Sequence, residues 1–246
     1  MATETLIHNL VTVHAGNLQK ALQDVRSEES AFDFMKVIPM PDVFMSLTKE
    51  SLFFLAFAGY LNSLNLGFRK LEQVLEPISD VMNIDKLESL LDEHHKVLKL
   101  RYDSNGDLRH PETYTSLPSK VENYLESGKT AYDCLIKYGA ITDLGWKKLN
   151  WGCTSSPEAF ELHDNQFYFE SFKTVPSKAI DKWAADHGLT MTFKSLDDEH
   201  KLWSVKEYKA GTVATFRYFD TKDLNGLIAD FEQLGKVDGQ DSRISA

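Results

Sequence analysis

Trp146–Phe172, with the sequence WKKLNWGCTSSPEAFELHDNQFYFESF, marks the point where the chain changes from helical to strand patterns. Aromatic residues, a Gly-Cys-Thr turn and a Ser-Ser-Pro break lead into an alternating strand predicted over 160–173. Upstream of this stretch, apolar residues recur at helical spacing, and downstream the order is strand, helix, strand. We therefore predict an α+β fold in which a sheet resumes after a helical segment.

The first residues predict one half of that sheet. Residues 7–14 alternate and contain β-branched side chains, residues 18–26 have helical spacing, and residues 32–38 alternate again. Pro39 and Pro41 end this second predicted strand, because proline lacks the amide that a sheet ladder needs. Strand, helix and strand in this order form half of a split βαβ unit.

Residues 42–140 predict a helical insertion. Apolar side chains fall on one helical face over 50–76 and over 84–100. A sequence of the capping-box type at 119–122 precedes a third helix that extends to Gly139.

The second half of the sheet follows the insertion. The predicted elements are a strand at 160–173, a helix at 177–187, a strand at 189–196, a hairpin of 202–208 with 212–219, and a helix at 224–234. Because βαβ crossovers are right-handed, we expect both crossover helices on one face of the sheet. The predicted domains are thus 1–41 and 141–236 for the two halves of the sheet, 42–140 for the insertion and 237–246 for a flexible tail.

The composition indicates an acidic, soluble protein. The 246 residues include 27 basic and 37 acidic side chains, a formal net charge of -10, which disfavours binding by neutralisation of phosphates. The longest apolar run, at 52–61, is shorter than the roughly 20 residues of a membrane-spanning helix. The two cysteines make no disulfide framework, and the first residues lack a signal-peptide pattern. We expect a cytoplasmic protein that does not associate with membranes.

Three segments follow the pattern of a known domain family. They are FDFMKVIPMP at 32–41, NWGCTSSPEAF at 150–160 and FESFKTVPSKAIDKWAADHGLTMTF at 169–193. In this order they resemble the YubB-type domain of bacteriophage and plasmid proteins; of that family's Asn-rich opening only Asn9 is present. The resemblance implies a ferredoxin-like split βαβ sheet, with the helical insertion and the C-terminal hairpin and helix as additions. It also implies an accessory role in a mobile genetic element, and it supplies no catalytic residues.

The junction provides the first candidate site. Trp146, Asn150, Trp151 and Gly152 either bind a partner or hold the junction together. Cys153, next in sequence, is the candidate nucleophile, and His163 with its neighbour Asp164 could supply a base and an orienting group. The competing hypothesis is a small buried side chain, which is the usual role of a free cysteine.

Histidines provide a second candidate. His94, His95 and His110, with Glu93, are residue types that bind metals. Adjacent helical residues point about 100° apart, so His94 and His95 do not readily face one ion. His94 also fits the apolar stripe of its helix, and we therefore expect it at the edge of the core, with no bound metal or other cofactor.

Two further patterns have a structural alternative. The stretch 103–107 begins like a calcium loop, but Leu108 and Tyr114 stand where the glycine and the glutamate of such a loop belong, so we predict a turn. Aromatic residues of the sheet could stack RNA bases, but the accompanying Lys/Arg-Gly-aromatic pattern is missing, so we predict core packing. These aromatic residues are Phe167, Phe169, Trp203 and Tyr208.

The function favoured by these patterns is that of a non-catalytic phage or plasmid protein. We expect it to bind a host protein in the bacterial cytoplasm, with a basic surface on that partner, and to counter an antiviral defence. A small Cys/His-dependent enzyme and an RNA-binding ferredoxin-like module are the alternatives. Direct binding to mixed-sequence DNA or RNA is not expected, because the net charge of the chain repels phosphate.

Overall fold

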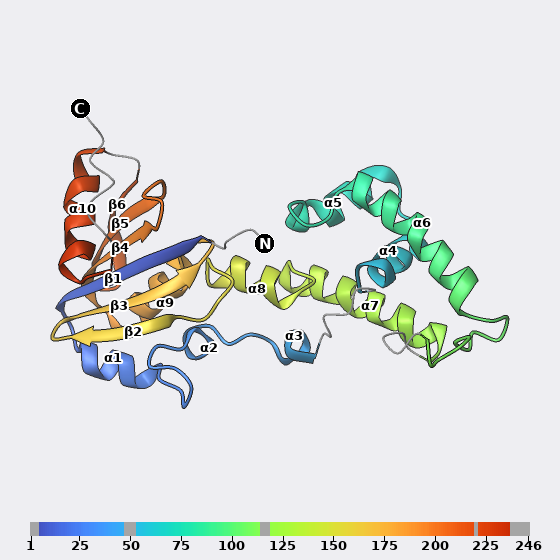
Figure 1. Ribbon diagram of the computed structural model, residues 1–246, viewed down its shortest axis with the longest axis horizontal. Helices are drawn as coiled ribbons and strands as arrows, with labels where there is room; N and C mark the ends of the chain where they lie inside the picture. The colour runs from blue at the N-terminus through green and yellow to red at the C-terminus, as the bar shows by residue number, and fades with distance from the viewer. Residues whose placement is uncertain (1–4, 47–52, 114–118, 219–220, 237–246) are drawn as a thin grey trace. The chain divides into compact units, whose positions relative to one another are not determined.

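The computed structural model describes residues 5–46, 53–113, 119–218 and 221–236 (Figure 1). The chain divides into two compact units. Residues 1–39 and 147–246 form the first, which we call the sheet unit, and residues 40–146 form the second, the helical unit. The predicted tail at 237–246 lies outside the described residues.

The sheet unit contains a six-stranded sheet in the order β2-β3-β1-β4-β5-β6, and neighbouring strands are antiparallel throughout. Its strands are β1 (Leu6–Ala15), β2 (Glu158–His163), β3 (Gln166–Phe172), β4 (Thr190–Asp197), β5 (Trp203–Lys209) and β6 (Thr212–Arg217). Its helices are α1 (Leu18–Asp24), α2 (Phe34–Val37), α9 (Ser177–His187) and α10 (Thr221–Gln233).

The prediction of an α+β fold is confirmed. The chain order β1, α1, β2, β3, α9, β4 with the spatial order β2-β3-β1-β4 is the ferredoxin-like arrangement of two split βαβ units. The predicted C-terminal hairpin is present as β5 and β6, which extend the sheet beyond β4, and the predicted last helix is α10.

Helices cover both faces of the sheet. The two crossover helices share one face, as predicted: the indole of Trp183 in α9 donates to the carbonyl of Ala21 in α1 at 3.0 Å and packs against Phe167. On the other face, α10 packs apolar side chains over Leu10 and Tyr168. The central strands are therefore buried on both sides, which removes their aromatic side chains from water.

One polar group lies inside this sheet. Asn9 on β1 is fully buried, donates to the hydroxyl of Ser171 on β3 at 3.0 Å, and accepts from the hydroxyl of Ser195 on β4 at 2.9 Å. Buried amides are tolerated when their hydrogen bonds are made. Asn9 therefore joins the three central strands through its side chain as well as through the backbone.

The predicted strand at 32–38 is wrong. Asp33 accepts from the amide of Met35 at 2.8 Å and so starts the short helix α2. The alternation that suggested a strand instead buries Phe32 and Phe34 beneath the sheet, against Phe169. The position of the second ferredoxin strand is occupied by β2.

The single strand predicted at 160–173 is also wrong, because it is a hairpin. His163 pairs with Gln166 across a two-residue turn, so β2 and β3 are neighbours in the sheet. Asp164 in that turn has a φ of +46°, a left-handed conformation that aspartate tolerates better than most residues.

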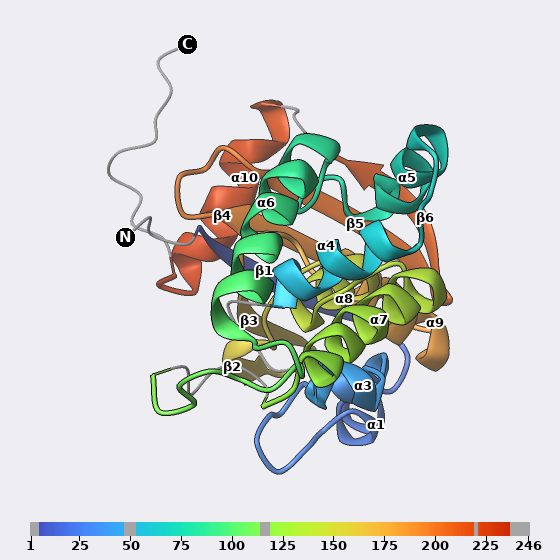
Figure 2. The same ribbon diagram turned by 90° about the vertical axis from the view of Figure 1, so that its right-hand side faces the viewer.

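The helical unit is a bundle in which α4 packs against both α6 and α7 (Figure 2). Its elements are α3 (Asp42–Ser46), α4 (Phe53–Ser63), α5 (Phe68–Leu75), the 3₁₀ helix η1 (Glu76–Ile78), α6 (Ile84–Arg101) and α7 (Val121–Tyr138). Helix α8 (Asp143–Asn150) contains the boundary between the two units. Among the described residues, two groups of buried apolar side chains contribute to the core of this unit, and Leu90 packs against both.

Two predictions in the helical unit need correction. The helix predicted over 50–76 is interrupted between α4 and α5, where Asn65 has a φ of +50°; residues 50–52 lie outside the described part. The predicted capping box is absent: the N-cap of α7 is Lys120, and its side chain makes no capping hydrogen bond.

Each edge strand of the sheet contains an irregularity. Glu158 of β2 pairs with Glu170 of β3, and the next pair is Glu161 with Tyr168. The stretch of β2 between these pairs is one residue longer than that of β3, so β2 contains a bulge. The register of β6 against β5 shifts in the same way between Glu207 and Tyr208. Bulges twist an edge and discourage a further strand from pairing with it.

Two helical glycines allow a matched test of the packing. A Cβ at Gly128 in α7 would lie 2.0 Å from the carbonyl oxygen of Ala56 in α4, whereas a Cβ at Gly226 in α10 meets no atom within 4 Å. We predict that Gly128→Ala lowers the free energy of unfolding by about 1–3 kcal/mol through overpacking. Gly226→Ala should raise it by about 0.5–1 kcal/mol, because alanine favours a helix. Urea denaturation followed by circular dichroism measures both; equal effects would contradict the close contact of α4 with α7.

Candidate functional site

The junction residues form a structural clamp. Trp151 is fully buried, and its indole N–H donates to the carbonyl of Ile38 at 2.9 Å. Its own carbonyl accepts from the amide of Ala179 at 3.1 Å, so it caps the start of α9, whose N-cap residue Pro176 offers no side-chain hydrogen bond. Of the two roles predicted for Trp151, the structure therefore supports the structural one.

Gly152 completes the clamp by allowing a close approach of the backbone. Its φ is +89°, and a Cβ there would lie 2.8 Å from the carbonyl oxygen of Val175. The hydroxyl of Thr174 donates to the carbonyl of Gly152 at 2.6 Å. Only glycine fits both the conformation and the available space.

The other two junction candidates differ in burial. Trp146 is buried in the helical unit, where its ring lies 6.3 Å from that of Phe44. Asn150 is half-buried at the last position of α8. Neither tryptophan of the junction offers a surface to a partner in this structure.

Cys153 and His163 are not brought together. Cys153 is fully buried, its thiol donates to the carbonyl of Ser155 at 3.2 Å, and burial raises its pKa to about 12. His163 is half exposed in β2, with Nε2 3.7 Å from a carboxylate oxygen of Glu161. Since the thiolate is the nucleophilic form, Cys153 is a poor nucleophile in this environment.

His94 occupies the core position predicted for it. It is buried, Nδ1 lies 2.9 Å from the hydroxyl of Tyr124, and its ring fills the space beside Gly59. Burial lowers the pKa of His94, and the neighbouring His95 lowers it further. Within the described residues, no group of three or more His, Cys, Asp or Glu side chains is placed to hold a metal ion.

The calcium-like stretch is a turn. One carboxylate oxygen of Asp103 accepts from the amides of Asn105 at 2.8 Å and of Asp107 at 3.0 Å. This is the local bonding expected of an aspartate in a loop.

The four sheet aromatics considered for RNA stacking are in the core. Each is less than 10 % exposed: Phe167 0 %, Phe169 0 %, Trp203 6 % and Tyr208 2 %. A base cannot stack on a buried ring, so these four side chains are not available for stacking with RNA bases.

A second buried histidine lies under α10. Nδ1 of His8 is 2.6 Å from the hydroxyl of Tyr168, which in turn donates to Glu170 at 2.7 Å. Because the hydroxyl proton is directed at Glu170, Nδ1 of His8 is the donor in the first contact. Burial is the main cause that lowers the pKa of His8. The negative charges of Glu170 and Asp198 raise this pKa, whereas His200 and Lys236 lower it further.

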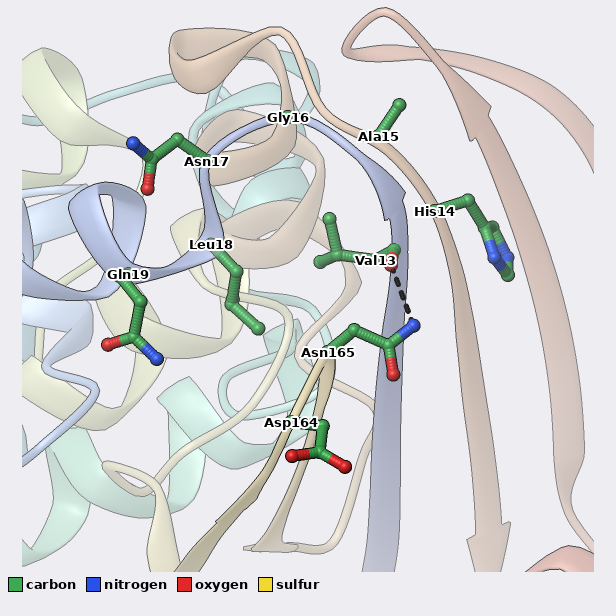
Figure 3. Close-up of a pocket in the computed structure, with 9 residues that line it drawn as sticks. All are labelled: Val13, His14, Ala15, Gly16, Asn17, Leu18, Gln19, Asp164 and Asn165. Atoms are coloured by element: carbon green, nitrogen blue, oxygen red, sulfur yellow. Dashed lines mark hydrogen bonds between the residues drawn. The ribbon is translucent and has the colours of Figure 1, made fainter.

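A surface hollow lies at the end of β1 where the chain turns into α1 (Figure 3). Its volume is about 470 Å³, and it lies between the β1–α1 connection and the β2–β3 turn. The residues that line it are Val13, His14, Ala15, Gly16, Asn17, Leu18, Gln19, Asp164 and Asn165. We call it the β1–α1 hollow.

Three side-chain atoms of this hollow have defined partners. The amide group of Asn165 donates to the carbonyl of Val13 at 3.1 Å (Figure 3), and the side-chain oxygen of Asn17 accepts from the amide of Lys20 at 2.9 Å. His14 lies on the other side of β1 from Leu18, with Nε2 2.8 Å from the hydroxyl of Thr192. No spacing in the sequence indicates this hollow, and Asp164 is a candidate there only as the neighbour of His163.

Comparisons with known proteins give one structural similarity. No family model matches the chain, and no curated protein matches it. Among solved structures, the chain is similar to the protein api92 from Yersinia pseudotuberculosis, of the family model DUF1281. The alignment covers 89 % of this chain and 99 % of that one, with a TM-score of 0.40 and 10 % sequence identity. A similarity at this level assigns no function.

The buried histidines predict a dependence of stability on pH. Both His8 and His94 have a folded-state pKa below the usual 6.5, so below that pH the unfolded chain binds more protons than the folded chain. The free energy of unfolding should therefore fall as the pH decreases from 7 to 5, by up to about 1.4 kcal/mol per pH unit for each histidine.

Two variants separate the contribution of one histidine. His94→Gln should reduce the steepness of this dependence, whereas His110→Gln, at a side chain that is 74 % exposed, should leave it unchanged. Urea denaturation at a series of pH values provides the comparison. A His94→Gln variant with the original steepness would show that His94 does not titrate as its burial requires.

Proposed function

We propose that this chain is a non-catalytic accessory protein of a bacteriophage or plasmid that binds a host protein and counters an antiviral defence. The origin and the role are drawn from the three segments, at 32–41, 150–160 and 169–193, that resemble the YubB-type domain. In this proposal the protein acts in the cytoplasm of the host bacterium. Within the described residues, no helix is both long and apolar enough to cross a membrane.

The observation that carries the binding role is the organisation of the helical unit. Residues 40–146 form a compact unit with core clusters of its own, inserted between α2 and β2 of the sheet unit. Specificity commonly resides in elements grafted onto a scaffold. In this unit Phe68, Leu100 and Ile136 are 63 %, 66 % and 62 % exposed, and exposed apolar side chains mark a protein interface where they form a patch.

The environment of Cys153 disfavours the enzyme alternative. A thiol that is buried, bonded to a carbonyl and raised in pKa to about 12 carries almost no thiolate at neutral pH. The proposed protein therefore needs neither Cys153 nor His163 for its activity, beyond their packing.

The edge strands support a surface on the helices rather than on the sheet. Addition of a partner strand to β2 or β6 would have to continue past a bulge in either strand. The net charge of -10 favours a partner with a basic surface, because long-range attraction speeds association between opposite charges.

Removal of the helical unit tests this proposal. Because Ile38 and Trp151 are joined by a hydrogen bond of 2.9 Å, the chain can be closed with a short Gly-Ser linker between Pro39 and Lys147. We predict that the shortened chain keeps its strands, as seen by circular dichroism and amide NMR spectra. It should no longer recover the host protein that the full chain captures from lysate, measured by quantitative mass spectrometry.

A point variant provides the matched comparison. Cys153→Ala in the full chain should recover the same host protein in the same yield. Recovery of that protein by the folded, shortened chain would place the binding surface on the sheet unit. Loss of activity in Cys153→Ala without loss of stability would favour the enzyme alternative.

A further inference from the structure

The β1–α1 hollow combines unused hydrogen-bond acceptors with a negative charge. The carboxylate of Asp164 makes no hydrogen bond or ion pair with any residue that the structure describes. The amide nitrogen of Asn165 is committed to the carbonyl of Val13, which leaves the side-chain oxygen of Asn165 as an acceptor. The side chain of Gln19 adds a further amide oxygen without a partner among the described residues.

The hollow also has an apolar part. Figure 3 shows the side chain of Leu18 between those of Gln19 and Asn165. Leu18 is 7 % exposed and Val13 is 5 % exposed, so the apolar surface beneath the polar rim is small. A long cationic side chain has the matching character, since its methylene stem packs on apolar surface while its charged end remains among polar groups.

We propose that the β1–α1 hollow receives a basic side chain, an arginine or a lysine, that a protein partner presents. The charged end would donate to the carboxylate of Asp164 and to the side-chain oxygen of Asn165, and the stem would lie over Leu18. Charge-assisted hydrogen bonds to a carboxylate are the stronger kind, and the planar guanidinium can bind both acceptors at once. Arginine should therefore bind more tightly than lysine.

This inference rests on the proposed function only in taking a protein as the source of the basic side chain. The volume of about 470 Å³ exceeds what a bare metal ion needs, and one carboxylate with amide oxygens is a weak ligand set for such an ion. A phosphate or another anion would be repelled by Asp164, which has no cation paired with it among the described residues.

The test uses the purified full chain and short blocked peptides, so that no host partner is required. Peptides of the form acetyl-Gly-X-Gly-amide, with X as arginine, lysine or norleucine, are titrated into the ¹⁵N-labelled chain. We expect the arginine peptide to shift the backbone amides of Gly16, Asn17 and Asn165 in a saturable way, the lysine peptide to do so more weakly, and the norleucine peptide to have no effect. Added salt should weaken the binding.

Matched charge variants identify the carboxylate. Asp164→Asn keeps the shape of the side chain and a residue that tolerates the left-handed turn, so the hairpin should remain folded. It should weaken binding of the arginine peptide at least tenfold. Asp186→Asn, which removes an exposed carboxylate paired with Lys182 on α9, should leave the affinity unchanged.

Several results would overturn the inference. They are equal binding of the norleucine peptide, unchanged affinity in Asp164→Asn, shifts confined to other parts of the chain, or saturable shifts with inorganic phosphate. Peptide binding without recovery of a host protein would remove the proposed function and leave the hollow as a cation site. Recovery of a host protein without peptide binding would remove the cation site and leave the proposed function.

Discussion

The clamp at Trp151 and Gly152 is the contact on which the organisation of the sheet unit depends. The chain leaves this unit just after Ile38 and returns just before Trp151, and the indole hydrogen bond holds these two points together. The carbonyl of Trp151 also caps α9, the helix that leads into β4. One residue thereby joins the two ends of the insertion and caps the helix of the second crossover.

Much of the fold can be predicted from the sequence, and the predictions that are wrong have physical causes. The helix ending at Gly188 and the final hairpin were predicted because their spacing and turn residues are local signals. The 32–38 segment has the pattern of a strand because buried Phe32 and Phe34 alternate as strand residues do, although Asp33 is a helix-capping residue. The pattern over 160–173 does not indicate the β2–β3 turn, because Asp164 and its neighbour supply it without a glycine.

The candidate sites were harder to predict, because burial is a property of the whole fold. Sequence alone kept Cys153 open as a nucleophile and Trp151 open as a binding residue, and both are fully buried. The expected core position of His94 followed from its place in an apolar stripe, which is a local pattern. The β1–α1 hollow joins residues 13–19 with Asp164 and Asn165, and no spacing in the sequence could indicate that contact.

The most direct test of this organisation is the stability of Gly152→Ala. A Cβ at this position would lie 2.8 Å from the carbonyl oxygen of Val175 and 3.0 Å from the amide nitrogen of Ser177, on a backbone with φ of +89°. Urea denaturation should show that the free energy of unfolding is lower by about 2–4 kcal/mol. Hydrogen exchange at the amide of Ala179 should be faster than in the original chain. Unchanged stability with slow exchange at Ala179 would contradict a central role for the clamp.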